Sequence, residues 1–79
     1  MRNYLEIGKN LRQARKGLLG LKRQMPLEEY LEEGYLLKQV CLVSVAIACL
    51  EEGVDDYLAF EWSLDREDRL LLLDMTGER

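Results

Sequence analysis

The chain has 79 residues, of which 48% are apolar and 33% charged, and its formal net charge is −4. This length predicts one domain, residues 1–79, and the composition excludes a disordered chain. The sequence contains no histidine, which excludes Ser-His-Asp and Cys-His catalysis, His-ligated zinc and the Glu-x-x-His di-iron motif. A domain of this size buries only about 60–65% of its unfolded surface, so a second chain is a common source of stability.

Residues 3–25 show the clearest periodicity in the sequence. This segment has apolar side chains at alternating intervals of three and four residues: Tyr4, Ile7, Leu11, Ala14, Leu18, Leu21 and Met25. Such a heptad stripe is typical of a helix that packs along its length on another helix. Gly8, Gly17 and Gly20 each lower helix stability by about 1 kcal/mol relative to Ala. The helix could therefore end near residues 17–20, or the glycines could let a neighbouring helix approach closely.

The next segment begins at Pro26, which is favoured at the first helical position, and ends at Gly53, a natural C-terminal cap. We expect one long helix here, or a short and a longer helix divided at Gly34. From Val40 to Leu50 every residue except Ser44 is apolar. Such a run is too short to cross a membrane, which requires about 20 apolar residues. Because it is apolar on more than one face, we expect it to be the central helix, with the first and last helices on either side.

Two cysteines lie in this central segment. On one helix Cys41 and Cys49 would be separated by a rise of about 12 Å, which is too far for a disulfide bond. We interpret them as small, buried apolar side chains. Free cysteines and the absence of a signal sequence favour a cytoplasmic protein.

Residues 57–75 admit two interpretations. Apolar and polar residues alternate from Leu58 to Leu64, which suits the first strand of a hairpin. The content of Leu, Ala, Glu and Arg favours helix, and a lone two-stranded hairpin is only marginally stable in water. We therefore expect helix, with Ser63 or Asp65 as the cap of a separate last helix and Gly77 at its end.

These elements predict an all-α fold, a small antiparallel helical bundle of three to four helices that is completed by dimerisation. Three short helices leave part of the central helix uncovered, and a second copy of the chain is the commonest means of covering it. The side chains assigned to this partner interface are Leu36, Val40, Val43, Ile47 and Leu50.

Charge is divided unevenly along the chain. Residues 1–23 carry seven basic groups and one acidic group, whereas residues 24–79 carry four basic and fourteen acidic groups. On a helix, the basic residues of the first segment gather opposite the heptad stripe. We interpret them mainly as a solvated face, paired in part with acidic helices of the same fold. An acidic protein partner or a lipid surface is a further alternative. The residues that would contact nucleic-acid phosphates are Lys9, Arg12, Lys16 and Arg23.

Carboxylates form two clusters that could attract a divalent cation. The spacing of a calcium loop is absent, and positions at helix ends or on solvated faces explain both clusters better. The sequence also lacks a glycine-rich phosphate loop. We therefore predict no catalytic residue, no cofactor and no metal site. The two clusters are Glu28, Glu29, Glu32 and Glu33, and Glu51, Glu52, Asp55 and Asp56.

Three stretches cover most of the chain: an amphipathic first helix in YLEIGKNLRQARKGLLGL, an apolar helix that runs into an acidic turn in EEGYLLKQVCLVSVAIACLEEGVDDYL, and a helix with a charged start in LDREDRLLLL. This layout resembles that of an uncharacterised bacterial family of short, dimeric HEPN-like helical proteins. HEPN ribonucleases carry an Arg-x4-6-His motif, so the resemblance implies a non-catalytic member here. It also implies a role as a partner or regulator, as in toxin–antitoxin pairs.

The sequence thus predicts a non-enzymatic helical interaction or regulatory protein that acts through protein–protein association, with itself as a homodimer or with an unknown protein partner. The alternative is a small nucleic-acid-associated regulator that uses the basic first helix. We expect no association with a membrane.

Overall fold

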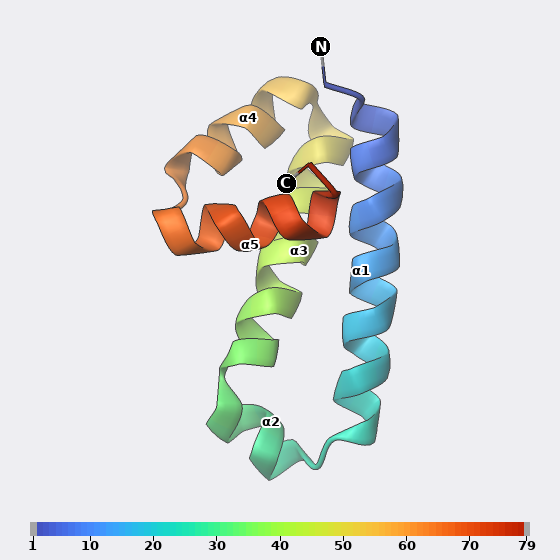
Figure 1. Ribbon diagram of the computed structural model, residues 1–79, viewed down its shortest axis with the longest axis vertical. Coiled ribbons are helices and arrows are strands. Elements are labelled where there is room, and N and C mark those ends of the chain that lie inside the picture. Colours follow the sequence, from blue (N-terminus) through green and yellow to red (C-terminus); the bar gives the residue numbers. More distant parts are fainter. Residues whose placement is uncertain (1, 79) are drawn as a thin grey trace.

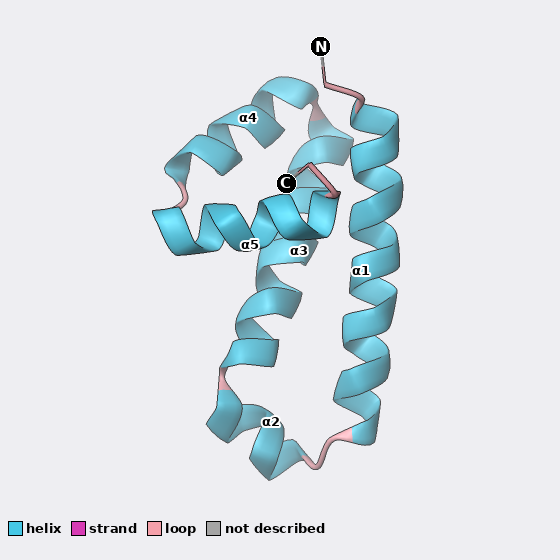
Figure 2. Cartoon of the chain, in the orientation of Figure 1, coloured by secondary structure: helices cyan, strands magenta, loops and turns pink. Residues whose placement is uncertain are grey.

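The computed structural model describes residues 2–78, and these residues form five helices and no strand (Figures 1 and 2). The all-α prediction is confirmed, and residues 57–75 are helical rather than a hairpin. The number of helices is five instead of the three to four expected, because the second and third segments are each divided in two. The helices are α1 (Tyr4–Gln24), α2 (Leu27–Glu33), α3 (Tyr35–Glu52), α4 (Val54–Ser63) and α5 (Arg66–Thr76).

Local signals determine most of the helix ends. Asn3 caps α1, since its side-chain oxygen accepts a hydrogen bond from the backbone N–H of Glu6 at 3.1 Å. Asp65 caps α5 in the same way, accepting from the N–H of Asp68 at 2.8 Å. Gly77 ends α5 in the left-handed conformation, with φ of 77°. α1 continues past its glycines to Gln24, so it does not end near residues 17–20.

Gly34 separates α2 from α3. Its φ of 66° lies in the left-handed region, which glycine adopts without a steric penalty. The two helices meet there at an angle of 79°, so the expectation of one long helix is wrong and the alternative of two helices without a loop is confirmed. The bend lays α2 across one end of the α1/α3 pair (Figure 1).

The long helices α1 and α3 run antiparallel, and α4 and α5 pack at the end of this pair that is remote from α2 (Figure 1). Gly8 lets α1 pack closely on α3, because a Cβ atom there would lie 2.8 Å from Arg12 Nη1 and 3.1 Å from Leu50 Cδ2, and both side chains would have to shift. The core between the helices is formed by Ile7, Leu11, Leu42, Val43, Ala46, Ile47, Tyr57 and Leu72.

Burial along α1 falls from its first half to its second. Ile7 and Leu11 are buried, Leu18 is half-buried, and Leu21 is 55% exposed. The reason is that α5 crosses only the half of the α1/α3 pair that contains Leu11 (Figure 1). The heptad stripe is therefore continuous in the sequence, while the layer that covers it extends over only part of its length.

Ionic contacts fix the shorter helices in place. The guanidinium of Arg2 pairs with Glu61 of α4 at 2.7 Å and with Glu78 beyond α5. Lys38 of α3 pairs with Asp68 of α5 at 2.7 Å. Arg2 therefore belongs to the packing of the chain ends and not to the basic face of α1, because it precedes the helix.

Within residues 2–78 no single helix has both the length and the apolar character needed to cross a bilayer; α2 and α3 meet that requirement only when taken together, across their 79° bend.

Candidate functional site

The structure places the five side chains assigned to a partner interface on the inner side of α3. Leu36, Val43 and Ile47 are at most 7% exposed, and Val40 and Leu50 are half-buried. Val43 and Ile47 belong to the core that α3 shares with α1, α4 and α5. A partner could not reach these three side chains without opening the fold. A helix that is apolar all round does not indicate by periodicity which of its faces will be internal.

The opposite face of α3 carries a row of apolar side chains that are partly exposed. Leu37 is 37% exposed and Val45 is 45% exposed, and Cys41 and Ala48 are also exposed. Spacings of four, four and three residues place these four side chains on one face of the helix. We call this set the α3 stripe. Lys38 and Glu52 flank it at its two ends, and no charged side chain interrupts it.

The cysteines differ from one another in environment. Both are free thiols, and Cys49 is half-buried. Burial raises the pKa of the Cys49 thiol, and the carboxylates of Glu52 and Asp56 raise it further. Cys41 is exposed in the α3 stripe, so the expectation of two buried cysteines is wrong for this one. Cys41 and Val43 lie on opposite faces of α3, so the packing that buries Val43 leaves Cys41 exposed.

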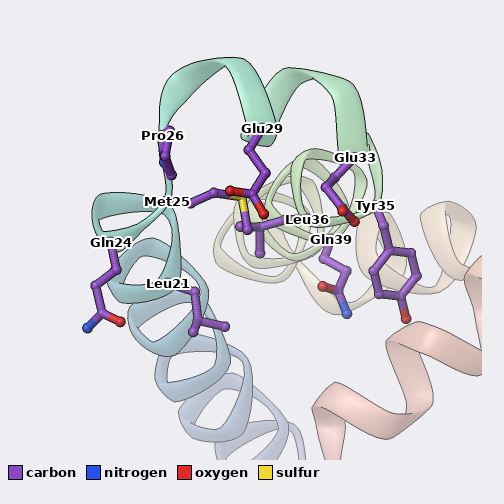
Figure 3. Close-up of a pocket in the computed structure, with 9 residues that line it drawn as sticks. All are labelled: Leu21, Gln24, Met25, Pro26, Glu29, Glu33, Tyr35, Leu36 and Gln39. Atoms are coloured by element: carbon purple, nitrogen blue, oxygen red, sulfur yellow. The ribbon is translucent and has the colours of Figure 1, made fainter.

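A pocket lies where the end of α1, α2 and the start of α3 meet (Figure 3). Its volume is about 440 Å³, and its apolar lining is formed by Leu21, Met25 and Leu36 together with Pro26. Figure 3 shows the side chain of Glu29 extending from α2 over Leu36, and that of Glu33 extending toward Gln39 and Tyr35. We call this site the corner pocket. It combines an apolar floor with a rim of two carboxylates one helical turn apart.

Among the described residues none of Glu28, Glu29, Glu32 and Glu33 forms an ion pair. Lys22, near the end of α1, lies beside α2, with its ammonium 5.5 Å from the centroid of the Tyr30 ring. The rim of the corner pocket therefore carries two carboxylates that form no ion pair within residues 2–78.

The structure also shows where the basic residues of α1 lie. Lys9, Lys16 and Arg23 are exposed, and within residues 2–78 none of them has an acidic partner. Arg12 pairs with Glu51 of α3 at 3.2 Å. Pairing with acidic helices of the same fold thus accounts for Arg12 alone among the four residues assigned to nucleic acid. Seven-residue spacing keeps the other three in one line along the helix.

Apolar side chains outside the α3 stripe are also exposed, among them Trp62, Leu5, Leu27 and Leu31. Trp62 is 73% exposed, and the guanidinium of Arg69 lies 5.1 Å from the centroid of its ring. Arg69 also donates to the carbonyl of Leu64 at 3.1 Å, so the pair closes the turn between α4 and α5. Leu5 is 89% exposed beside a smaller hollow of about 250 Å³. The wall of that hollow includes the paired side chains Arg12 and Glu51.

Neither of the two carboxylate clusters forms a metal-binding group. In the part of the chain that the structure describes, no three side chains of His, Cys, Asp or Glu gather closely enough to hold an ion. The α3 stripe and the corner pocket are the surfaces with the clearest chemistry. Comparison of the chain with protein-family models, with curated proteins and with solved structures finds no match.

Sequence reasoning missed both surfaces for different reasons. Residues 35–52 have two apolar faces when they are drawn on a helical wheel. Leu37 and Val45 lie on one face, and Val43 and Ile47 lie on the other, so the sequence contained the signal for the α3 stripe. The corner pocket depends on the bend at Gly34, which turns α2 back over the end of α1. A glycine in a helical pattern signals such a bend only weakly, because Gly17 in α1 produces none.

Proposed function

We propose that this protein is a non-enzymatic helical interaction protein that associates with a second copy of itself through the α3 stripe. The observation that carries the proposal is an apolar face on the central helix that remains partly exposed within residues 2–78. Exposed apolar side chains in a continuous row are a feature of association surfaces. The two free thiols support a cytoplasmic location as part of the same proposal.

The charges at the ends of the stripe favour an antiparallel pair of α3 helices. A two-fold axis between Ser44 and Val45 would place Cys41 against the partner subunit's Ala48. It would also bring Lys38 near the partner subunit's Glu52, and symmetry would repeat this contact at the other end. Lys38 pairs with Asp68 of its own chain, and a further carboxylate from the partner would strengthen the attraction. A parallel pair would instead place like charges together, which is unfavourable.

The decisive experiment is sedimentation velocity of the full chain over a wide concentration range. The expected species has twice the chain mass of 9.2 kDa. The double variant L37K/V45K should be monomeric, because it places four ammonium groups in the dimer interface. The matched control is V54K/L70K, which makes the same chemical changes at side chains that are 39% and 42% exposed outside the stripe. A parent chain that stays monomeric, or a control that dissociates equally, would overturn the proposal.

Cysteine cross-linking tests the arrangement of the pair. In the proposed register Val45 lies beside the partner subunit's Val45, whereas the two Cys41 residues are separated by about 10 Å along the helix axis. Oxidation should therefore trap a dimer of V45C made in a background without Cys41 and Cys49. A protein that keeps only Cys41 should not be trapped. Efficient trapping through Cys41 and not through V45C would contradict the antiparallel register.

The chain resembles small HEPN-like helical proteins in the layout of its helices. Because it contains no histidine, the resemblance implies a member without the catalytic motif, which acts as a partner or regulator. An antiparallel pair of long helices with a dimer surface on the second one is compatible with that assignment. RNA cleavage by the purified protein would rule out a non-catalytic role.

A second candidate function is nucleic-acid association through α1. The supporting observation is the line of three exposed and unpaired basic residues, Lys9, Lys16 and Arg23. Binding of RNA or DNA should weaken steeply with salt, by a slope that grows with the number of phosphate contacts. The variant K9E/K16E should abolish it. Absent binding, or binding that salt does not change, would eliminate this candidate.

A further inference from the structure

The corner pocket marks the place where the chain's own helical layers stop. Over the first half of the α1/α3 pair, Leu72 of α5 is fully buried against Ile7, Leu11 and Val43. Over the second half no helix takes the position of α5, and Leu21 remains 55% exposed. The apolar floor of the pocket is therefore the continuation of a groove that already accommodates a helix.

The dimensions of the pocket suit side chains of a protein segment. Its volume of about 440 Å³ lies within the range of sites that take up several apolar groups, about 300–1,000 Å³. Leu21 of α1 and Met25, which directly follows α1, form one wall, and Leu36 forms the other from α3 (Figure 3). Two walls from antiparallel helices are the arrangement into which an amphipathic helix inserts anchors at spacings of three and four residues.

The rim specifies the charge of the occupant. Glu29 and Glu33 line the pocket, and neither has an ion pair within residues 2–78. An apolar ligand that carried carboxylates would be repelled there, whereas Lys or Arg beside the apolar anchors would be attracted. A second copy of this chain does not meet the requirement. Five of its seven exposed basic residues within residues 2–78 lie on α1, whose apolar stripe faces its own core at Ile7 and Leu11. The other two are Lys38, which pairs with Asp68, and Arg66 of α5, a helix whose apolar face is buried at Leu72.

From these observations we propose that the corner pocket binds a basic amphipathic helix of another protein, with apolar side chains on Leu21, Met25 and Leu36 and with Lys or Arg against Glu29 and Glu33. This site is separate from the self-association surface, because none of the residues that line the corner pocket belongs to the α3 stripe. A dimer formed through the α3 stripe would present two such pockets.

The probe is a synthetic helix of 18 residues built from Leu and Lys, with the leucines in one stripe and a fluorescent label at its N-terminus. The control probe has the same leucines and Glu in place of each Lys. Fluorescence anisotropy is measured with the full chain at about 0.15 M salt, where diffuse attraction between exposed charges is largely screened. We expect saturable binding of the Leu/Lys probe and none of the Leu/Glu probe.

The variant E29K/E33K should weaken binding of the Leu/Lys probe by about tenfold or more. The matched control is E28K/E32K, which makes the same change in charge, on the same helix and at the same spacing, at two exposed residues that do not line the pocket. It should change the affinity by no more than about twofold, because charges outside the contact act only through screened attraction. A third variant, L21N, tests the apolar floor at an exposed position and should also weaken binding.

Three results would overturn the proposal: no saturable binding of the Leu/Lys probe, equal loss of affinity in E29K/E33K and E28K/E32K, or full affinity in L21N. The monomeric variant L37K/V45K separates this inference from the proposed dimer. Binding that persists in L37K/V45K supports a pocket that acts alone. Loss of binding in L37K/V45K, with the variant still folded by circular dichroism, would overturn the assignment to a site within one chain.

Discussion

At the scale of single residues, the best-defined polar environment surrounds Arg2. Its guanidinium lies 5.7 Å from the ring centroids of both Tyr4 and Tyr57, and Tyr4 and Tyr57 meet edge to face with centroids 6.2 Å apart. Tyr57 is fully buried. Its hydroxyl has no hydrogen-bond partner among the described residues, so it adds a desolvation cost that its ring must outweigh.

The hydroxyl of Tyr57 should be dispensable near neutral pH. Because an unpaired buried hydroxyl is unfavourable, Y57F is expected to be as stable as the parent or more stable by up to about 1 kcal/mol. Y57A should lose about 3–5 kcal/mol, since it removes the aromatic ring from the core. Urea unfolding at pH 7 measures both changes. A loss of more than about 1 kcal/mol in Y57F would show that the hydroxyl has a partner.

The same hydroxyl predicts a change in stability at alkaline pH. Burial raises the pKa of Tyr57 to about 12, above its ordinary value of about 10 in an unfolded chain. The folded state therefore holds this proton more tightly, so the contribution to stability is present below about pH 10 and is lost between about pH 10 and 12. Y57F should lose less stability than the parent over this range. Y35F, which alters an exposed ring, should follow the parent.

At the scale of helices, glycine has different effects at different positions. Gly34 has positive φ and creates the bend between α2 and α3. Gly17 and Gly20 are ordinary helical residues of α1, and a Cβ atom at either would have no neighbour within 4 Å. Their only effect on the fold is therefore the entropy that they lose when the helix forms.

Alanine substitutions should separate these effects. G17A and G20A are each expected to stabilise the protein by about 1 kcal/mol, because alanine is the better helix former and nothing obstructs its methyl group. G34A should destabilise it by about 1–2 kcal/mol, because alanine resists the left-handed conformation. Thermal unfolding of the three single variants measures the differences. A more stable G34A would mean that α2 and α3 can form one straight helix.

Much of this helical architecture could be predicted from the sequence, because its signals are local. The stripe from Tyr4 to Met25 predicts α1, and Asp65 and Gly77 predict the ends of α5, since capping acts within one helical turn. The inner face of α3 could not be predicted in the same way. Val43 and Val45 are equally apolar, and the path of the chain through Gly34 and Gly53 decides which of them faces α1. The corner pocket depends on that same path.

At the scale of the whole molecule, the fold is an antiparallel helix pair that is closed at one end and open at the other. The molecule measures 41 Å in its long dimension and 23 Å in each of the others. At the closed end, Arg2 joins α1 to Glu61 of α4 and to Glu78 beyond α5. At the open end, α2 crosses the pair without a layer above it, as Figure 1 shows.

The contacts of Arg2 should matter for global stability more than those of other basic residues. Its side chain is 28% exposed and Glu61 is 13% exposed, so R2A should lose about 1–2 kcal/mol, as expected for partly buried charge-assisted hydrogen bonds. R2K should lose less, because it keeps the charge but not the planar fork. K9A, at an exposed residue, should change little. Chemical denaturation checks the order, and an unchanged R2A would show that this cluster is not stabilising.

The ion pair between Arg2 and Glu78 has a consequence for engineering. Since residues 2 and 78 are held side by side, a short Gly/Ser linker could join them without distorting either helix. The chain could then be reopened at Gly53, in the break between α3 and α4. Such a circular permutant would keep every helix intact. Its new ends would lie between α3 and α4, which follow one another in the parent chain. Comparison of the permutant with the parent chain would show how the order in which the helices are synthesised affects folding, because the packing of the folded protein would be the same in both.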